Sequence, residues 1–161
     1  MARIVIIAAV GKNLELGYNN NLIWHLKEDM KYFKEMTMGH KVIMGYNTYT
    51  SLPKLLVGRE NIILTSKNIE IDGAQIFNNI DALMEYLDSI DEEVFIIGGA
   101  MLYKTFVDKA DVLLLTEIGE ECEEADVFFP SFKKENYERE VVKKGEENQI
   151  GYSFVKYRRV K

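Results

Sequence analysis

The sequence predicts an α/β fold in which a mainly parallel central sheet, flanked by about four helices, ends in an antiparallel C-terminal strand. Short apolar runs rich in β-branched residues recur along the chain, and uninterrupted runs of this kind suit strands covered on both faces. Segments with helical periodicity lie between these runs. Strands that alternate with helices indicate α/β architecture.

The expected elements follow in order along the chain. The five apolar runs expected to form strands are residues 4–9, 42–44, 61–65, 94–97 and 112–116. The helices expected between and after them are residues 26–37, 47–52, 80–87 and 100–107. Two later runs, 137–142 and 152–157, are separated by the polar segment KKGEENQIG, which favours an antiparallel hairpin. Residues 11–25 show no clear period and are expected to form a long loop, a kind of segment that often carries function.

Length, composition and charge narrow the class of protein. The 161 residues suffice for one domain with a sizeable core, and we find no repeat or linker, so residues 1–161 are interpreted as a single domain. The net charge of −6 argues against binding to nucleic acid or an anionic membrane, and no apolar run reaches membrane-spanning length. The lone Cys122 excludes an intrachain disulfide and fits a cytoplasmic setting. With only two histidines besides, a zinc site is not expected.

One carboxylate lies on the apolar side of a predicted helix. At about 100° per residue, Leu26, Met30, Phe33 and Met36 share one face of the segment LKEDMKYFKEMT, and Asp29 falls among them. Burying an unpaired charge is costly, so such a group is either satisfied by a partner or kept for chemistry. Asp29 is therefore the first candidate for a functional residue.

Two strand-to-helix junctions resemble each other. KVIMG precedes the helical segment YNTYTSL, and VFIIGG precedes AMLYKTF, so each strand ends in glycine just before a helix begins. Glycine lets a ligand approach the backbone, and a helix N-terminus offers free N–H groups to an anion. Two adjacent junctions would suit the pyrophosphate of a dinucleotide. For either junction alone, the favoured explanation is that glycine simply turns the chain.

Three further residues are candidates, each with an ordinary structural alternative. Arg59 could clamp a carboxylate of an anionic substrate, since arginine binds carboxylates bidentately, or it could be a solvated surface residue. Thr116, at the end of an apolar strand, could donate a hydrogen bond to a buried carboxylate or only pack in the strand. Trp24 could form part of a lid or of the core.

Taken in order and spacing, these segments resemble the dihydrofolate reductases over nearly the whole chain. The matching segments are IIAAV, the loop from Gly17 to Trp24, KVIMG, GRENIIL, VFIIGGAMLY, LLLTEI, DVFFP and YSFVKYRR. The resemblance implies reduction of 7,8-dihydrofolate to 5,6,7,8-tetrahydrofolate by hydride transfer from NADPH. It also implies antifolate inhibitors as ligands and a monomer in the cytoplasm.

The resemblance also implies roles for individual residues. Asp29, supported by Thr116 and with Trp24 nearby, would bind the pterin and favour protonation at N5 through water. The residues implied to contact the substrate are Ile7, Ala9, Met30, Phe33, Leu52, Leu56, Arg59, Ile97 and Tyr103, of which Arg59 would hold the glutamate α-carboxylate. Those implied to contact the cofactor are Ala9, Leu16, Gly17, Gly45, Tyr46, Asn47, Thr48, Leu64, Thr65, Ser66, Lys67, Gly98, Gly99, Ala100, Met101 and Leu102.

Backbone features are implied as well. The Gly98–Gly99 bond is expected to be cis, and residues 11–24 are expected to form a lid that excludes water from the nicotinamide. Asp126 would lie in the loop that supports the closed lid.

The sequence departs from the family pattern at the lid and at the adenosine end of the cofactor. Ile23 and Lys27 stand where prolines are common, which predicts a more mobile lid. Tyr46 and Met101 are uncharged at positions where basic residues often hold the 2′-phosphate. Lys67, beside Ser66, could replace that charge. We therefore expect weaker discrimination against NADH than in relatives with two arginines there.

Three alternatives are weighed against this interpretation. The reductase of riboflavin biosynthesis shares the cofactor junctions but needs neither Asp29 nor Arg59. A non-catalytic binding protein on the same scaffold has little support from the sequence, because the residues of the implied site are all present: Trp24, Asp29, Phe33, Arg59 and Thr116. In the third alternative, a plain α/β interaction domain, Asp29 would be a structural carboxylate whose hydrogen bonds are satisfied within the protein.

Overall fold

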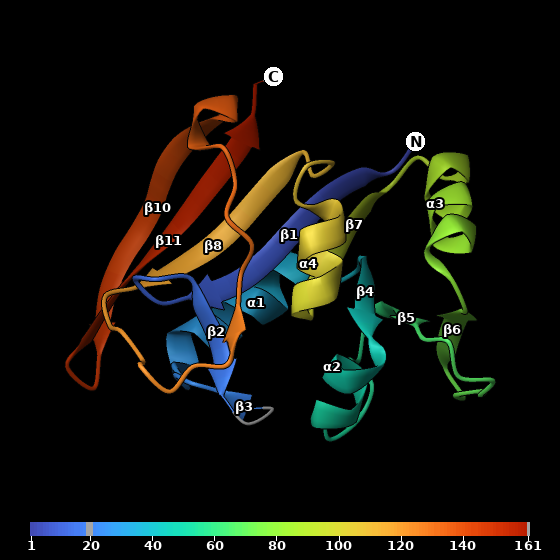
Figure 1. Cartoon of the computed structure of the whole chain (residues 1–161), viewed down its shortest axis with the longest axis horizontal. Coiled ribbons are helices and arrows are strands. Elements are labelled where there is room, and N and C mark those ends of the chain that lie inside the picture. The colour runs from blue at the N-terminus through green and yellow to red at the C-terminus, as the bar shows by residue number, and fades with distance from the viewer. Residues whose placement is uncertain (19–20, 161) are drawn as a thin grey trace.

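The computed structural model describes residues 1–18 and 21–160, and an eight-stranded sheet runs through it (Figure 1). The strand order is β10-β11-β8-β1-β7-β4-β5-β6. The strands are β1 (Arg3–Val10), β4 (Lys41–Gly45), β5 (Glu60–Leu64), β6 (Ala74–Phe77), β7 (Glu93–Gly98), β8 (Val112–Ile118), β10 (Tyr137–Glu147) and β11 (Ile150–Arg159). Neighbours from β8 through β6 pair in parallel, whereas β11 pairs antiparallel with both β8 and β10. The predicted mainly parallel sheet with an antiparallel C-terminal strand is confirmed.

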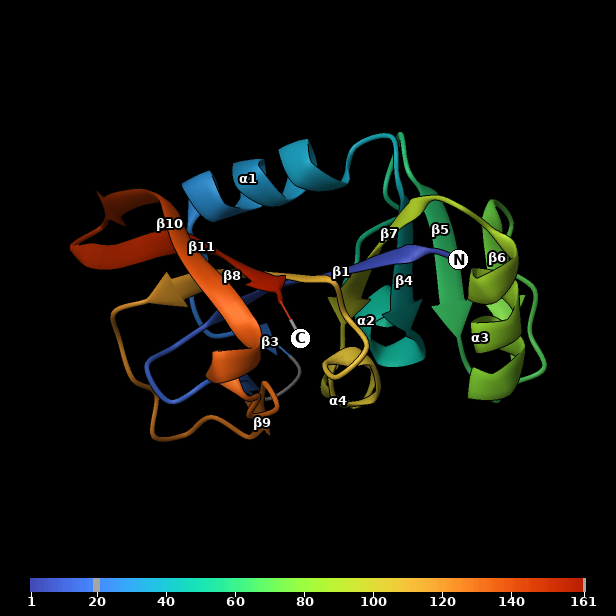
Figure 2. The same ribbon diagram turned by 90° about the horizontal axis from the view of Figure 1, so that it is seen from above.

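Helices cover both faces of this sheet. They are α1 (Lys27–Thr37), α2 (Tyr46–Ser51), α3 (Ile80–Ser89) and α4 (Ala100–Phe106), with a short 3-10 helix, η1 (Lys134–Asn136). Seen from above, α1 lies on one side of β1 and α4 on the other (Figure 2). The four expected helices are confirmed to within two residues at each end. Among the described residues, no helix is long and apolar enough to cross a membrane.

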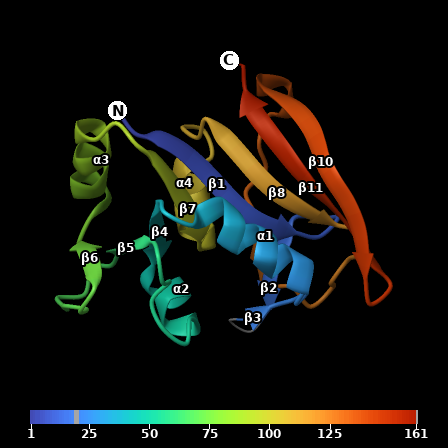
Figure 3. The ribbon, with the colours of Figure 1, turned by 180° about the vertical axis from the view of Figure 1, so that it is seen from behind.

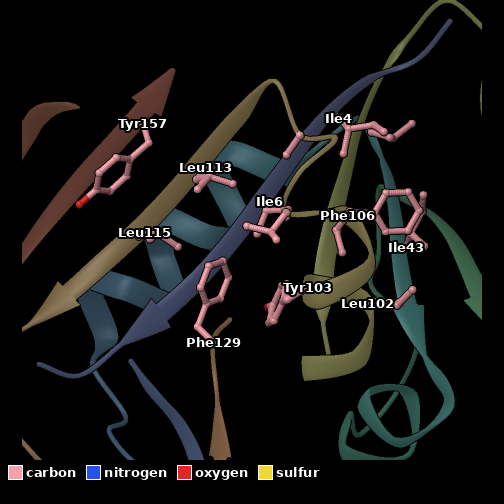
Figure 4. Packing of buried hydrophobic residues seen from close by; sticks show 14 of the residues in the cluster. Ile4, Ile6, Ile43, Leu102, Tyr103, Phe106, Leu113, Leu115, Phe129 and Tyr157 are labelled. Carbon is pink, nitrogen blue, oxygen red and sulfur yellow. The ribbon is translucent and has the colours of Figure 1, made fainter. Parts of the chain in front are cut away.

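The apolar run of β1 is continuous because both faces of the strand are buried. Ile4 and Ile6 belong to a core cluster that α3 and α4 complete, while Val5 and Ile7 belong to a second cluster beneath α1 and α2. Figure 4 shows the first cluster, with Ile6 close to aromatic side chains of α4 and of the segment after β9. Because both faces are covered, alternation of apolar and polar residues is lost, as expected for a buried parallel strand.

The C-terminal hairpin is longer than predicted. The polar segment expected to be its loop instead continues both strands, and only Asn148 and Gln149 form the turn. Both have positive φ, 53° and 67°, which fits a two-residue hairpin turn of the twist that antiparallel strands favour. The error has a physical origin: β10 is the exposed edge of the sheet, so its polar residues resemble those of a loop.

A second, three-stranded sheet takes two of its strands from the segment predicted to be an irregular loop and the third from residues 127–128. Its order is β3 (Asn21–Leu22), β2 (Glu15–Tyr18), β9 (Val127–Phe128). Residues 19 and 20 of the predicted lid lie outside the described residues. The expectation of a loop without strands is wrong, as is the omission of β6 at the sheet edge. All four of these strands have four residues or fewer, too short to show a period in the sequence.

Candidate active site

The carboxyl ends of the parallel strands meet at one edge of the sheet, which is where open α/β sheets bind ligands. Residues predicted to contact the cofactor lie at the ends of three neighbouring strands there: Gly45 ends β4, Thr65 follows β5 and Gly99 follows β7. The structure thus brings together junctions that are far apart in the sequence. Viewed from behind, α1 crosses in front of β1 near this edge (Figure 3).

The partner expected for the carboxylate of α1 is present. The Thr116 hydroxyl donates a hydrogen bond of 2.5 Å to Asp29 Oδ1. Thr116 is only 2% exposed and pairs with Ala9 across the β1–β8 ladder, so Asp29 lies over the ends of these two strands. Burial raises the pKa of Asp29, and the hydrogen bond from Thr116 opposes that rise.

An apolar wall extends from Asp29 along α1. Five residues predicted to contact the substrate belong to or pack against the same cluster; they are Ile7, Phe33, Leu52, Leu56 and Ile97. Tyr103 approaches from the opposite face of the sheet, and its buried hydroxyl donates to the Ile7 carbonyl at 2.9 Å. Burial raises the pKa of Tyr103, so its hydroxyl stays protonated and uncharged and takes part in the site only through hydrogen bonds.

One member of the predicted apolar face is misplaced. Met30 is 60% exposed, whereas Leu26 on the same predicted face is 3% exposed. The helix rotates Met30 away from the sheet, so its assignment to the packed face is wrong. Contact between Met30 and a bound substrate remains a prediction.

Arg59 lies at the other end of α1. Its Nη1 donates to Thr37 Oγ1 at 3.2 Å, and its Nε donates to the Val57 carbonyl at 3.0 Å. Burial lowers the pKa of Arg59, although arginine stays charged throughout the working pH range. Asp29 and Thr37 are eight residues apart on one helix, about 12 Å at 1.5 Å per residue. A positive charge and a partly buried carboxylate therefore mark the two ends of one elongated wall.

The two glycine junctions lie against each other. A Cβ placed on Gly45 would make an ordinary contact, 3.9 Å, with the Gly99 nitrogen. Gly98 has φ +140°, and a Cβ there would lie 2.9 Å from Thr48 Oγ1, so the position requires glycine. The Gly98–Gly99 peptide bond is cis, as the resemblance predicts.

The side chains expected at the adenosine end are arranged around a lysine. Lys67 Nζ lies 5.2 Å from the centre of the Tyr46 ring, a cation–π contact. Asn78 Nδ2 holds the loop after β5 by donating to the carbonyls of Thr65 and Lys67, at 2.9 and 3.0 Å. Met101 is 79% exposed at the start of α4. Lys67 is thus the cation that this loop presents beside Tyr46.

Two other predicted cofactor contacts have different surroundings. The side chain of Leu102 is 3% exposed and packs in the core, and contact between Leu102 and the cofactor stays a prediction. Leu16 lies on β2 and packs partly buried against the same core. Its neighbour Gly17 accepts a hydrogen bond from the Asp126 backbone N–H at 3.0 Å, which connects the predicted lid to the loop before β9.

The family model that matches the chain is described as dihydrofolate reductase and covers residues 3–159. The chain belongs to the dihydrofolate reductase family. The dihydrofolate reductase of Bacillus subtilis (strain 168) is 37% identical over 155 residues, which cover 94% of this chain and 91% of that protein. Dihydrofolate reductase HdrB of Haloferax volcanii is 32% identical over 167 residues, 98% of this chain and 84% of that protein.

A solved structure agrees with these relatives. Dihydrofolate reductase from Enterococcus faecalis, complexed with NADP(H) and RAB-propyl, superposes with a TM-score of 0.89 at 26% identity, covering 99% of this chain and 97% of that one. As a member of the dihydrofolate reductase family, the protein reduces 7,8-dihydrofolate to tetrahydrofolate with NADPH. Family membership decides against the riboflavin reductase and the plain interaction domain.

Two acidic residues of this dihydrofolate reductase escaped the sequence analysis. Glu15 is 1% exposed, and its carboxylate accepts backbone N–H groups of Asn13 and Cys122, each at 2.7 Å. Burial alone would raise its pKa, but these hydrogen bonds outweigh burial and lower it. A signal was available, since Glu15 stands between two leucines, Leu14 and Leu16, in the predicted loop. The second acidic residue is Glu147, the last residue of β10, and its neighbours in the sequence gave no comparable signal.

Proposed function

We propose that Asp29 binds the 2-amino and N3 edge of the pterin ring of dihydrofolate. The observation that carries this proposal is the hydrogen bond from Thr116, which holds Asp29 Oδ1 beside the apolar wall, so that Oδ2 can accept from a ligand's donors. A carboxylate accepts two parallel N–H bonds well, and the edge of a pterin offers such a pair. Burial strengthens these bonds because water competes less.

Asp29 then favours protonation of the pterin at N5. Its negative charge, held close to the ring, stabilises positive charge that develops there, and water delivers the proton. Trp24 and Ala9 both pack against the cluster that contains Leu26, and there Trp24 would limit the access of bulk water. The apolar wall holds the pterin in a fixed orientation, so that the protein acts mainly through positioning and electrostatics.

The cofactor NADPH fits the paired glycine junctions. Gly45, Gly98 and Gly99 leave the backbone uncovered where β4 and β7 end, so that a pyrophosphate can approach it. The residues that would hold the cofactor there are Gly45, Asn47, Thr48, Gly98, Gly99 and Ala100, with Leu64, Thr65 and Ser66 nearer the adenosine. When bound, NADPH supplies the hydride that reduces the pterin C6.

Arg59 is proposed to bind the glutamate end of the substrate. The spacing of about 12 Å along α1 between Asp29 and Thr37, to which Arg59 is bonded, matches an elongated ligand with a ring at one end and a carboxylate at the other. The pyrophosphate junctions lie elsewhere on the same edge, so substrate and cofactor do not compete for Arg59.

Lys67 is proposed to contribute the charge that selects NADPH over NADH. Its ammonium lies over Tyr46, which follows Gly45, so both side chains border the adenosine end of the cofactor. One flexible lysine offers a point charge without the bidentate geometry of arginine. NADPH is therefore preferred and NADH is tolerated.

The remaining assignments rest on family membership. They are a single domain over residues 1–161, a monomer, a cytoplasmic location and inhibition by antifolates. Gel filtration and inhibition assays on the purified chain test the second and the fourth.

The decisive experiment compares oxidation of NADPH and NADH, with dihydrofolate as substrate, in the wild type and in Asp29→Asn. We expect NADPH turnover in the wild type and a loss of more than a hundredfold in Asp29→Asn, with circular dichroism unchanged. Wild-type turnover in the folded Asp29→Asn variant would remove Asp29 from the reaction. A preference for NADPH that survives Lys67→Ala would remove Lys67 from cofactor selection.

A further inference from the structure

Helix α1, which carries Asp29 in its first turn, begins without a cap of its own. Leu26 occupies the N-cap position with extended backbone angles, φ −104° and ψ 123°, and provides no side-chain hydrogen bond. The first N–H groups of a helix have no partner within it and need one from elsewhere.

The missing cap comes from the C-terminal hairpin. Glu147, at the end of β10, accepts the backbone N–H of Lys27 at Oε2 (2.8 Å) and that of Glu28 at Oε1 (3.1 Å). A carboxylate at this end of a helix is also stabilised by the helix dipole. The hydrogen bonds from Lys27 and Glu28 lower the pKa of Glu147, so the cap is charged at neutral pH.

The hairpin holds Glu147 in place through its own geometry. Glu147 pairs with Ile150 directly before the two-residue turn, which fixes its distance from the strand β11. On β11, Phe154 stacks on Tyr32 of α1, with ring centres 4.1 Å apart and planes 9° from parallel. The hairpin therefore touches α1 at two places, one apolar and one polar.

Lys27 makes this arrangement possible. It occupies the first helical position, where the sequence departs from the family's common proline. Proline has no backbone N–H and would remove the shorter of the two bonds to Glu147. The departure and the hairpin cap thus coincide at one residue.

We propose that Glu147 is a positioning residue for the reaction. By capping the first turn of α1, it fixes the backbone that carries Asp29, two residues after Lys27, against Thr116. The inference rests on the proposed role of Asp29. Glu147 touches neither substrate nor cofactor and acts only through the helix.

The test compares Glu147→Ala and Glu147→Gln with the control Glu146→Ala, which removes the same charge from the adjacent residue of β10. All are assayed well below their melting temperatures. We expect Glu147→Ala to raise the KM for dihydrofolate about tenfold, within the range that a misplacement of 1 Å or less produces, and to leave the KM for NADPH unchanged. Glu147→Gln, which keeps one acceptor oxygen, should recover part of the loss, and Glu146→Ala should match the wild type.

A second pair of variants isolates the N–H group. Lys27→Ala keeps the donor and Lys27→Pro removes it, and proline suits this position because Leu26 before it is extended. In the Lys27→Pro background, Glu147→Ala should raise the KM for dihydrofolate clearly less than it does in the Lys27→Ala background. Equal costs in the two backgrounds, or equal rises in both KM values, would overturn the proposal.

The outcome for Asp29→Asn separates this inference from the proposed function. If Asp29→Asn is inactive while Glu147→Ala retains the wild-type KM for dihydrofolate, only the positioning role fails. If Asp29→Asn is fully active, the proposed role of Asp29 fails first.

Discussion

Replacing Thr116 by valine tests how much one hydroxyl contributes to the site. Valine has nearly the shape of threonine but no hydroxyl, so the packing of β8 should survive while the hydrogen bond to Asp29 is lost. At 2.5 Å, this bond has the length of a charge-assisted O–H···O⁻ bond, and Thr116 is 2% exposed, so water cannot easily replace it.

The magnitude follows from these two facts. A hydrogen bond to a charged group contributes about 1.5–3 kcal/mol, and each 1.36 kcal/mol corresponds to a factor of ten. We therefore expect kcat/KM for dihydrofolate to fall by about 10- to 100-fold in Thr116→Val. Because the lost bond favours the charged carboxylate, the pKa of Asp29 should rise further.

The assay is steady-state oxidation of NADPH across a pH series, with dihydrofolate varied at each pH. Thr116→Ser serves as the matched control, because it keeps the donor and loses only a methyl group. The reasoning is refuted if Thr116→Val keeps the wild-type kcat/KM, or if Thr116→Ser loses as much as Thr116→Val.

Three further predictions concern stability and substrate binding. Burial raises the pKa of Asp29 above its unfolded value near 4, so the ionised group destabilises the fold at neutral pH. Asp29→Asn should raise the free energy of unfolding at pH 7 by about 0.5–2 kcal/mol, and urea titrations should show this gain vanishing below pH 4. Arg59→Lys should raise the KM for dihydrofolate about tenfold but not that for a dihydropterin lacking glutamate, since lysine cannot bind bidentately. Gly98→Ala should lower the urea-unfolding free energy by about 1–3 kcal/mol, because φ is +140° and Thr48 is close; an unchanged midpoint would contradict this.

The sequence analysis succeeded where local composition determines structure. The continuous apolar runs of β1 and β8 predicted buried parallel strands, and the period of α1 placed Asp29 near the sheet. The bond between Asp29 and Thr116 was also anticipated, because a buried carboxylate needs a donor and the family resemblance offered one. The rotation of α1 was predicted less well, since Met30 and Leu26 differ in exposure although the period assigned them to one face.

What the sequence did not reveal is how side chains satisfy distant backbone groups. Glu15 bonds to the N–H of a residue 107 positions away, and Glu147 bonds to N–H groups 119 and 120 positions away. Every residue but proline carries a backbone N–H, so the sequence does not show which N–H group donates to a given carboxylate. Only the fold determines which N–H groups lack a partner.

These distant contacts matter because both ends of the proposed substrate site lie on or beside α1. Thr116 of β8 bonds to Asp29, Glu147 of the hairpin caps the helix start, and Arg59 bonds to Thr37 in the last turn. Three segments separated in sequence thus fix one helix of eleven residues, which is too short to be stable alone in water. Because the spacing between Asp29 and Arg59 must match the substrate, the helix needs fixed ends more than it needs intrinsic stability. The polar contacts at its two ends, and not its apolar face alone, therefore set the distance between Asp29 and Arg59 on which the proposed binding of dihydrofolate depends.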